Sequence, residues 1–318
     1  MHLTGCFLIF KKLAKNFLMC YYIFMESFCK SCPRHCKVNR KESVGFCGAK
    51  NFCQISKVMF HHWEEPVISG GEKDVGSGAI FFSHCNLKCV YCQNYEISHF
   101  DVGKTCIDAE LAMIFRDLEQ NGALNINLVT PTHYAQNIIN ALKIYRPKIP
   151  IVYNTGGYDS PEMLKKLKNY VDVYLTDFKY YDNALAEKYS SAPKYLENIK
   201  KCLKIMRENC PEDIVENGLM KKGIIVRHLI LPNHTDDSIK VLDEIKNILG
   251  EKTYISLMSQ YTPHGKACDF EEINRKLKPL EYKRVKNHLI KLGFINGFVQ
   301  ELESATEEFI PDFETKEN

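Results

Sequence analysis

The sequence predicts an α/β fold with a mainly parallel sheet, and three observations lead to this expectation. The chain has 318 residues, enough for one large domain with an extension or for two ordinary domains. From residue 78 onward, short segments rich in β-branched and aromatic residues alternate with longer amphipathic segments. Six such strand–helix units give a parallel sheet with right-handed crossovers. A doubly wound sheet and an incomplete barrel both fit this pattern.

The strands are expected where short apolar runs are bounded by turn residues. These runs are 79–83, 125–129, 150–153, 171–176, 223–230 and 253–258. The helices between them have recognisable ends, as at Ser160-Pro161, where an N-cap residue precedes proline at the first helical position. Asp108 and Thr235 open two further helices, which end at Asn121 and Gly250, and the last helix runs from Pro279 to Gly293.

Composition and charge exclude several classes of protein. Hydrophobic residues make up 45% of the chain and charged residues 25%, as in ordinary folded proteins, so disorder and low complexity are excluded. The net charge is only +3, from 42 basic and 39 acidic residues, and this does not indicate a nucleic-acid partner. The basic residues between Arg275 and Lys291 lie opposite Tyr282, Val285 and Leu289 at helical spacing, which indicates a solvated helix face.

The first 26 residues do not have the pattern of a secretory signal. Lys11, Lys12 and Lys15 interrupt the apolar residues, so neither half approaches the roughly 20 residues that span a bilayer. A membrane-surface helix is one reading of this segment, and a packed or frayed leader helix is the one we favour. We therefore expect a cytoplasmic protein without a membrane partner, in which the 14 cysteines serve metal binding or catalysis rather than disulfides.

Cys85, Cys89 and Cys92 form a C-x3-C-x2-C triplet directly after the first predicted strand. The carboxyl ends of parallel strands are where α/β proteins build active sites. Three thiolates bind three irons of a [4Fe–4S] cluster and leave the fourth iron open, whereas a structural cluster usually takes four cysteines. The alternative is a zinc site made by the three cysteines and a histidine such as His84.

A second group of cysteines precedes this triplet. Cys29, Cys32, Cys36 and Cys47 have enough reach to surround one ion or cluster, with Cys53 close behind in the sequence. Neighbouring basic residues would offset the negative charge of bound thiolates. The sequence leaves three alternatives open here: zinc, a second iron–sulfur cluster, or free cysteines in a loop-rich cap.

Several motifs besides the cysteine triplet resemble one known family. They are Cys32-Pro-Arg-His-Cys36, Glu64-Glu-Pro66, Gly76-Ser-Gly78, Cys92-Gln-Asn-Tyr95, Asn154-Thr-Gly-Gly157, Asp177-Phe-Lys179 and Val226-Arg-His-Leu-Ile-Leu-Pro232. Together with the triplet they resemble the radical S-adenosylmethionine (SAM) enzymes. Within that superfamily the chain is most similar to a branch related to the pyruvate formate-lyase activating enzymes, whose members carry an extra N-terminal cysteine segment.

The resemblance implies a partial (β/α)6 barrel of the TIM type at residues 76–301. A Cys-rich N-terminal extension would precede it at 27–75, with the leader at 1–26 and an acidic tail at 302–318. It also implies that Cys85, Cys89 and Cys92 hold a [4Fe–4S] cluster whose open iron chelates SAM. One electron, from reduced flavodoxin or ferredoxin, then releases a 5′-deoxyadenosyl radical that abstracts hydrogen, with no catalytic side chain beyond these cofactors.

The resemblance assigns further residues to SAM. Tyr91 matches the position that packs against adenine, and Asp177 and Lys179 lie two apart at the end of the fourth strand, facing the same side. Arg227 is a charge inside a predicted strand, so it needs a partner, for which we expect the SAM carboxylate or ribose. Asn154 and Thr155 end the third strand at the same mouth.

The target implied by the resemblance is a glycyl-radical protein. The alternatives are radical modification of another peptide, an RNA or a small molecule, or a non-catalytic iron–sulfur electron carrier or zinc-stabilised binding protein. The chain departs from the superfamily after the second strand, where Val129-Thr-Pro-Thr-His133 stands in place of Gly-Gly-Glu. Gln93 also stands where the true activating enzymes usually have histidine.

Overall fold

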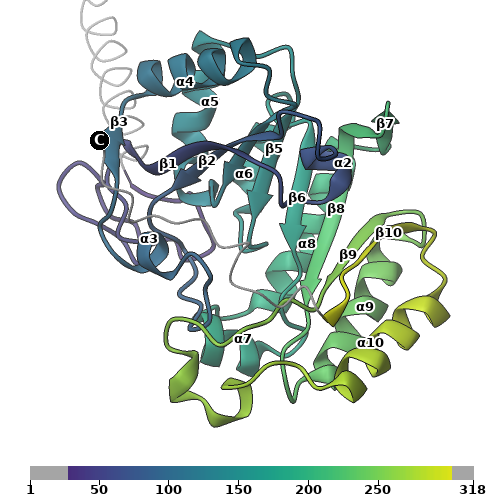
Figure 1. Ribbon diagram of the computed structural model, residues 1–318. Coiled ribbons are helices and arrows are strands. Elements are labelled where there is room, and N and C mark those ends of the chain that lie inside the picture. Colours follow the sequence, from purple (N-terminus) through teal and green to yellow (C-terminus); the bar gives the residue numbers. More distant parts are fainter. Residues whose placement is uncertain (1–27, 303–318) are drawn as a thin grey trace, which may run out of the picture.

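An open sheet of mainly parallel strands forms the centre of the molecule (Figure 1). The computed structural model describes residues 28–302, so the expectations for the leader and for almost all of the acidic tail lie outside the described residues. The parallel strands, in their order across the sheet, are β2 (Ser77–Phe82), β4 (Ile126–Val129), β5 (Ile151–Thr155), β6 (Val173–Asp177), β8 (Leu219–Leu229), β9 (Tyr254–Met258) and β10 (Asn296–Val299). The order is a path with two ends rather than a ring, which makes the fold a partial barrel.

All six strands predicted from the sequence are confirmed, with ends that differ by a few residues. The sequence did not predict four further strands, which are β1 (Cys53–His61), β3 (Lys104–Cys106), β7 (Ile214–Glu216) and β10. β1 pairs antiparallel with β2, so that Phe60 lies opposite Gly78, and β3 pairs antiparallel with β1. Residues from the expected N-terminal extension therefore supply β1, the strand between β2 and β3 at one end of the central sheet.

Helices follow most of the parallel strands. They are α4 (Asp108–Gln120), α5 (Ala135–Ile144), α6 (Pro161–Leu167), α7 (Asn183–Ser190), α8 (Tyr195–Asn209), α9 (Thr235–Leu249) and α10 (Pro279–Leu292), with the shorter α2 (Pro66–Ser69) and α3 (Tyr95–His99). The four predicted helices are confirmed, and the Ser160 hydroxyl accepts a hydrogen bond from the Met163 amide as an N-cap should. Asp108 is the first residue of α4 rather than its cap, because Ile107 takes that position and donates its N–H to Glu110.

Figure 1 shows α4 and α5 together at one end of the sheet and α9 and α10 at the other. Large apolar side chains fill the space between the helices and the sheet, including Tyr153, Tyr174 and Leu203, which are all buried. Burial of this kind contributes most of the free energy of folding. The outward residues of the strands therefore anchor the helices, which leaves the inward residues free to build a site.

The inward residues form two layers, because alternate side chains of a strand share a face. The lower layer is apolar, and in it Ile68 of α2 packs with Val152, Val173, Leu175 and Ile225. Two residues further along three of these strands come the polar residues of the upper layer, Asn154, Asp177 and Arg227. The apolar layer closes the barrel from below and raises the polar groups to its mouth.

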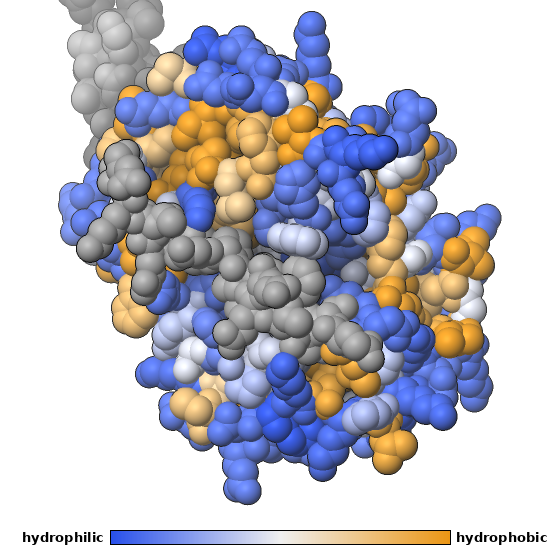
Figure 2. Space-filling view, in the orientation of Figure 1, coloured by the Kyte–Doolittle hydropathy of each residue, from blue (hydrophilic) through white to orange (hydrophobic). Residues whose placement is uncertain are grey.

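The last helix confirms the expectation of a solvated basic face. Tyr282, Val285 and Leu289 of α10 are buried, and basic residues occupy its other sides. Figure 2 shows hydrophilic residues over most of the region around α9 and α10, broken by separate hydrophobic patches. Within residues 28–302, no helix is both long and apolar enough to cross a bilayer.

Candidate active site

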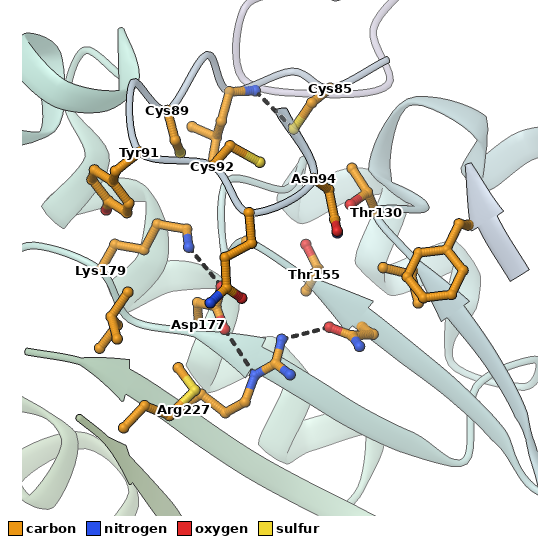
Figure 3. Close-up of a pocket in the computed structure, with 18 of the residues that line it drawn as sticks. Cys85, Cys89, Tyr91, Cys92, Asn94, Thr130, Thr155, Asp177, Lys179 and Arg227 are labelled. Carbon is orange, nitrogen blue, oxygen red and sulfur yellow. Dashed lines mark hydrogen bonds and ion pairs between the residues drawn. The ribbon is translucent and has the colours of Figure 1, made fainter. Parts of the chain in front are cut away.

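A pocket of about 240 Å³ opens at the carboxyl ends of the parallel strands. Its upper wall is the cysteine loop, Cys85–Cys92, which follows β2, and its lower wall is formed by the ends of β4, β5, β6 and β8 (Figure 3). The predicted site residues that line it are Cys85, Cys89, Tyr91, Cys92, Asn154, Thr155, Asp177, Lys179 and Arg227. The structure therefore brings the triplet and all six predicted SAM-facing residues to one cavity.

Backbone hydrogen bonds fasten the cysteine loop to the end of α7. The Lys88 amide donates to the carbonyl of Ser190 at 3.1 Å, and the Val90 amide donates to the carbonyl of Tyr189 at 2.8 Å. From the other side, the Arg34 guanidinium donates to the carbonyl of Asn86 at 2.6 Å. Because its backbone is held at several points, the loop presents its thiols in a fixed arrangement, which lowers the entropic cost of binding a ligand.

Each thiol of the loop has a hydrogen-bond partner suited to a thiolate. The Leu87 amide donates to Cys85 Sγ at 3.4 Å, and the Ser98 hydroxyl donates to Cys92 Sγ at 3.4 Å. Cys89 Sγ lies 2.9 Å from the Ser190 hydroxyl. Burial nevertheless raises the pKa of all three thiols, that of Cys92 to about 11. A bound cation is what would hold such buried sulfurs in the ionised form.

The floor of the pocket is an ion-pair layer, made by Glu64, Asn154, Asp177, Lys179 and Arg227. Lys179 Nζ lies 2.7 Å from one Asp177 oxygen, and Arg227 Nε donates to the other at 2.9 Å (Figure 3). Burial opposes ionisation of Asp177, but the Lys179 and Arg227 charges lower its pKa below the ordinary value. Asp177 is thus an ionised carboxylate between two cations.

Arg227 uses its remaining donors within the chain. Its Nη1 donates to Glu64 at 3.0 Å and its Nη2 donates to the Asn154 side-chain oxygen at 2.6 Å. The partners of this buried charge in the structure are therefore side chains, where the sequence suggested the SAM carboxylate or ribose. Its guanidinium still lines the pocket, so it sets the shape and charge of the floor.

Glu64 is the principal residue of the site to which the sequence gave no role. Its carboxylate accepts from Asn127 and Asn154, each at 2.9 Å, in addition to Arg227. It comes from the segment between β1 and α2, far from the other strands in the sequence. The run of two acidic residues before Pro66 was the available signal, because acids beside a strand end need a partner.

Thr155 and Tyr91 each have an internal partner. The Thr155 hydroxyl donates to Asp159 at 2.7 Å, and burial raises the pKa of that carboxyl. The Tyr91 hydroxyl lies 2.5 Å from the Tyr180 hydroxyl, while its ring packs edge-on against Tyr261 with centroids 5.8 Å apart. Both residues keep a surface on the pocket, but their polar atoms are engaged elsewhere.

Glycine is required where the Asn154-Thr-Gly-Gly157 motif passes the next strand. Gly157 has a φ of +79°, and a Cβ there would lie 2.2 Å from the Asp177 carbonyl oxygen. A Cβ on Gly156 would lie 2.8 Å from the Leu87 side chain in the cysteine loop. The two glycines thus let β5 and the loop approach each other and close the pocket.

The segment after β4, where the sequence departs from Gly-Gly-Glu, lies at the pocket. Val129, Thr130 and Thr132 line the pocket at this place. Among the described lining residues, the carboxylates are those of Glu64 and Asp177 in the ion-pair layer. Within residues 28–302, the acidic groups that face the cavity thus come from other elements.

The alternative of a zinc site completed by His84 is not favoured by the geometry. His84 Nε2 lies 2.9 Å from the Gln54 side-chain oxygen and 3.4 Å from Asp101. Its other ring nitrogen faces Gly48, where a Cβ would come within 3.0 Å. The imidazole therefore contacts Gln54 and Gly48, and His84 is not among the residues that line the pocket.

The chain belongs to the radical SAM superfamily. The model of that superfamily matches residues 79–245, just over half of the chain. An uncharacterized protein of Methanocaldococcus jannaschii, MJ0674, is 35% identical over 261 residues, which cover 78% of this chain and 70% of that protein. Members of this superfamily bind a [4Fe–4S] cluster and SAM, so these cofactors follow from membership.

Two solved structures align with part of this chain. SuiB of Streptococcus suis, bound to its precursor peptide SuiA, is 16% identical with a TM-score of 0.47 over 70% of this chain. The matched region spans about half the length of SuiB, 48%. Methylornithine synthase (PylB) is 12% identical with a TM-score of 0.45, over 68% of either chain.

Proposed function

We propose that this protein is a radical SAM enzyme of the branch related to the pyruvate formate-lyase activating enzymes. In it, a [4Fe–4S] cluster and SAM together would supply a 5′-deoxyadenosyl radical for hydrogen abstraction, after one electron from reduced flavodoxin or ferredoxin. The observation that carries the proposal is the fixed loop of three cysteines on the wall of a pocket at the carboxyl ends of the strands. A site with three thiolates leaves one iron open for a ligand.

The residues present fit this pair of cofactors. The Cys85 and Cys92 sulfurs accept hydrogen bonds, and the Cys89 sulfur lies 2.9 Å from the Ser190 hydroxyl. Burial keeps all three as thiols until a cation compensates their charge. Hydrogen bonds to ligand sulfurs and limited solvent exposure are the protein's usual means of setting a cluster's potential. We therefore assign Cys85, Cys89 and Cys92 as the cluster ligands.

The other pocket residues would bind SAM and exclude water. The Tyr91 ring would pack against adenine, because its hydroxyl is already satisfied by Tyr180 and leaves the ring as the binding surface. Lys179 and Asp177 would contact polar groups of SAM at the mouth of the barrel. Arg227, held by Glu64 and Asn154, would fix the charge of the floor without leaving its partners.

The target that we propose is the α-hydrogen of a glycine in a glycyl-radical protein. Support for it comes from the motifs that the chain shares with the activating-enzyme branch, which extend over most of residues 29–301. Gln93, which lines the pocket next to Cys92, differs from the usual histidine of the true activating enzymes. The partner protein would therefore differ from pyruvate formate-lyase itself.

The experiment that tests the activity is anaerobic reconstitution of the cluster, followed by reduction and addition of SAM. We expect 5′-deoxyadenosine to form, measured by liquid chromatography. A protein whose cluster is intact by absorbance and iron analysis, yet forms no 5′-deoxyadenosine, would refute the proposed enzyme class.

The target is tested separately with peptides that carry α-deuterated glycine. Transfer of deuterium into 5′-deoxyadenosine is the expected result for a glycyl-radical target, with peptides of α-deuterated alanine as the matched control. If 5′-deoxyadenosine forms without deuterium from any glycine, the glycyl target is wrong while the enzyme class stands.

A further inference from the structure

The N-terminal cysteines, Cys29, Cys32, Cys36 and Cys47, are not grouped as a metal site in the structure. They lie outside the pocket, and the cysteines within residues 28–302 are free thiols. In the same residues, no group of three or more cysteine, histidine or acidic side chains is placed to hold a metal ion. Zinc or a second cluster on these four cysteines therefore stays a prediction from the sequence.

Asp159 is a buried acidic residue directly behind the wall of the pocket. It lies between β5 and α6 and is only 1% exposed. Its backbone carbonyl accepts hydrogen bonds from the Asn198 side chain at 3.0 Å and from Cys202 Sγ at 3.3 Å. Both donors belong to α8, so this helix holds Asp159 in a fixed position.

Three neutral hydroxyl groups donate to the Asp159 carboxylate. Thr132 and Tyr153 donate to Oδ1 at 2.6 and 3.1 Å, and Thr155 donates to Oδ2 at 2.7 Å. Among the described residues, no lysine, arginine or histidine side chain bonds to either oxygen or shifts the pKa of the group, which burial raises. Because a buried charge ordinarily has an oppositely charged partner, this carboxylate lacks a cation.

Two of the three hydroxyl donors lie on the wall of the pocket. Thr132 begins the 3₁₀ helix η1 (Thr132–Tyr134), which follows β4, and Thr155 ends β5. Both residues line the cavity, and their hydroxyl oxygens are 3.1 Å apart. Figure 3 shows Thr155 in the middle of the pocket, between the cysteine loop and Asp177. The carboxylate of Asp159 is thus separated from the cavity by one hydroxyl group.

The hydrogen bonds to Asp159 decide what these two threonines can do in the cavity. A hydroxyl has one hydrogen and two acceptor positions, and each threonine gives its hydrogen to Asp159. The Thr155 oxygen also accepts from the Gly157 amide at 3.3 Å, which leaves it one acceptor position. Toward the cavity, both groups can therefore only accept. The charge of the carboxylate polarises the two hydroxyls and strengthens them as acceptors.

The matching ligand group is a nitrogen donor that carries positive charge. The carboxylates that line the pocket, Glu64 and Asp177, are already paired with Arg227 and Lys179. Asp159 is the nearby carboxylate without such a partner in residues 28–302. SAM, whose binding follows from family membership, has one amino group, which is an ammonium ion when free and keeps N–H donors when it binds a metal.

We propose that the Thr132 and Thr155 hydroxyls accept hydrogen bonds from the amino group of SAM, and that Asp159 is the residue that positions them. Asp159 directs both hydroxyl hydrogens away from the cavity and supplies the negative charge that compensates the ligand. Two threonines and a carboxylate behind them thus do the work of an acid on the segment after β4. The inference rests on the proposed function for the place of SAM in this pocket.

The experiment is calorimetric titration of the anaerobically reconstituted full chain with three ligands. SAM has an amino group and a sulfonium, S-adenosylhomocysteine keeps the amino group without the sulfonium charge, and 5′-methylthioadenosine has neither. In the Thr132→Val variant, the affinity for the two amino-bearing ligands should fall about tenfold, because one hydrogen bond to a charged group is lost. The affinity for 5′-methylthioadenosine should stay at the wild-type value.

The Asp159→Asn variant should give the same selective loss by a different route. An asparagine amide would donate to a threonine oxygen, so that the threonine turns its own hydrogen toward the cavity and meets the amino group as a donor. If this variant does not fold, as judged by circular dichroism, Thr155→Val replaces it, because valine keeps the shape of threonine. Its affinity for the two amino-bearing ligands should also fall about tenfold.

Two further variants control for the loss of a buried hydroxyl. Thr132→Ser keeps the hydroxyl and should restore the affinity for SAM to within about twofold of the wild type. Thr176→Val removes a buried hydroxyl that is outside the pocket, so all three affinities should equal those of the wild type.

The possible results separate this inference from the proposed function. Unchanged SAM affinity in Thr132→Val and Asp159→Asn would overturn the inference, and so would an equal loss for all three ligands, which would indicate a change in pocket shape. A loss for SAM alone would mean that the threonines contact the sulfonium instead. A wild-type protein that binds neither amino-bearing ligand would refute the place of SAM in the pocket and, with it, the proposed function.

Discussion

The two walls of the pocket differ in how their charges are compensated. In the ion-pair layer, two carboxylates face two cations, and each of Glu64, Asp177, Lys179 and Arg227 has a charged partner within 3.0 Å. In the cysteine loop, burial keeps three thiols neutral although hydrogen-bond donors suited to thiolates surround them. The ion-pair layer, whose charges are already paired, shapes the cavity. The cysteine loop has hydrogen-bond donors for negative charges that its thiols do not yet carry, and this marks where a ligand binds.

The largest effect should come from breaking the cysteine loop. In the Cys89→Ala variant we expect the loop to lose its cluster and 5′-deoxyadenosine to fall below detection, because one of three ligands is gone. Removal of a single buried sulfur should cost only about 1–2 kcal/mol of stability. Iron content, product and thermal unfolding measure the three quantities.

The matched control for this change is the Cys268→Ala variant. Cys268 is exposed and lies outside the pocket, so iron content and product should equal those of the wild type. Product formation that survives in Cys89→Ala would show that this sulfur is not a cluster ligand.

The next effect should come from breaking the ion-pair layer. The Asp177→Asn variant leaves Lys179 without its carboxylate and Arg227 with one fewer, in a site where these side chains are 14–18% exposed. Removing one partner of a buried pair should lower the free energy of unfolding by about 3 kcal/mol, measured in urea. The Asp236→Asn variant is the control, because it breaks the exposed pair with Arg284 and should cost about 0–1 kcal/mol.

The difference in free energy of unfolding between wild type and Asp177→Asn should depend on pH, and the sign of this dependence is defined. Lys179 and Arg227 lower the pKa of Asp177 in the folded protein, despite its burial, so its contribution to stability is present above the unfolded-state pKa of about 3.9. The contribution is lost as the pH falls through the lower, folded-state pKa. Wild type and Asp177→Asn should therefore converge in stability in acid. A difference that is constant with pH, or an Asp177→Asn variant as stable as Asp236→Asn, would contradict the pairing.

The comparison also shows how much of the fold and of the site could be predicted from the sequence. The six strands and the triplet could be predicted because their signals are local: an apolar run of about five residues, or three cysteines within eight positions. Asp177 and Lys179 were placed on one side of a strand end by the same local logic, and they do face the same pocket. The six residues predicted to face SAM thus reach one cavity because each lies near the carboxyl end of a strand or within the cysteine loop.

What the sequence could not give is the partner of each charge. The hydrogen bond from Arg227 to Glu64 joins residues 163 positions apart, and no local pattern encodes it. Strand β1 was missed for a related reason, since its burial is irregular along Cys53–His61 and its partner β2 belongs to a different segment. The residue type determines which kind of hydrogen-bond or ion-pair partner a buried side chain requires. The topology of the fold determines which residue provides that partner.

The smallest effect should come from Tyr91, which connects the two walls. It belongs to the cysteine loop, but its hydroxyl lies 2.5 Å from that of Tyr180, three residues after Asp177. The Tyr91→Phe variant should lose about 1 kcal/mol of stability with this hydrogen bond and keep the affinity for SAM, because the ring remains. The Tyr91→Ala variant should weaken SAM binding roughly tenfold, measured by calorimetry on the reconstituted protein. If Tyr91→Phe weakens binding as much as Tyr91→Ala, the hydroxyl pair rather than the ring positions SAM, and the two walls act as one unit.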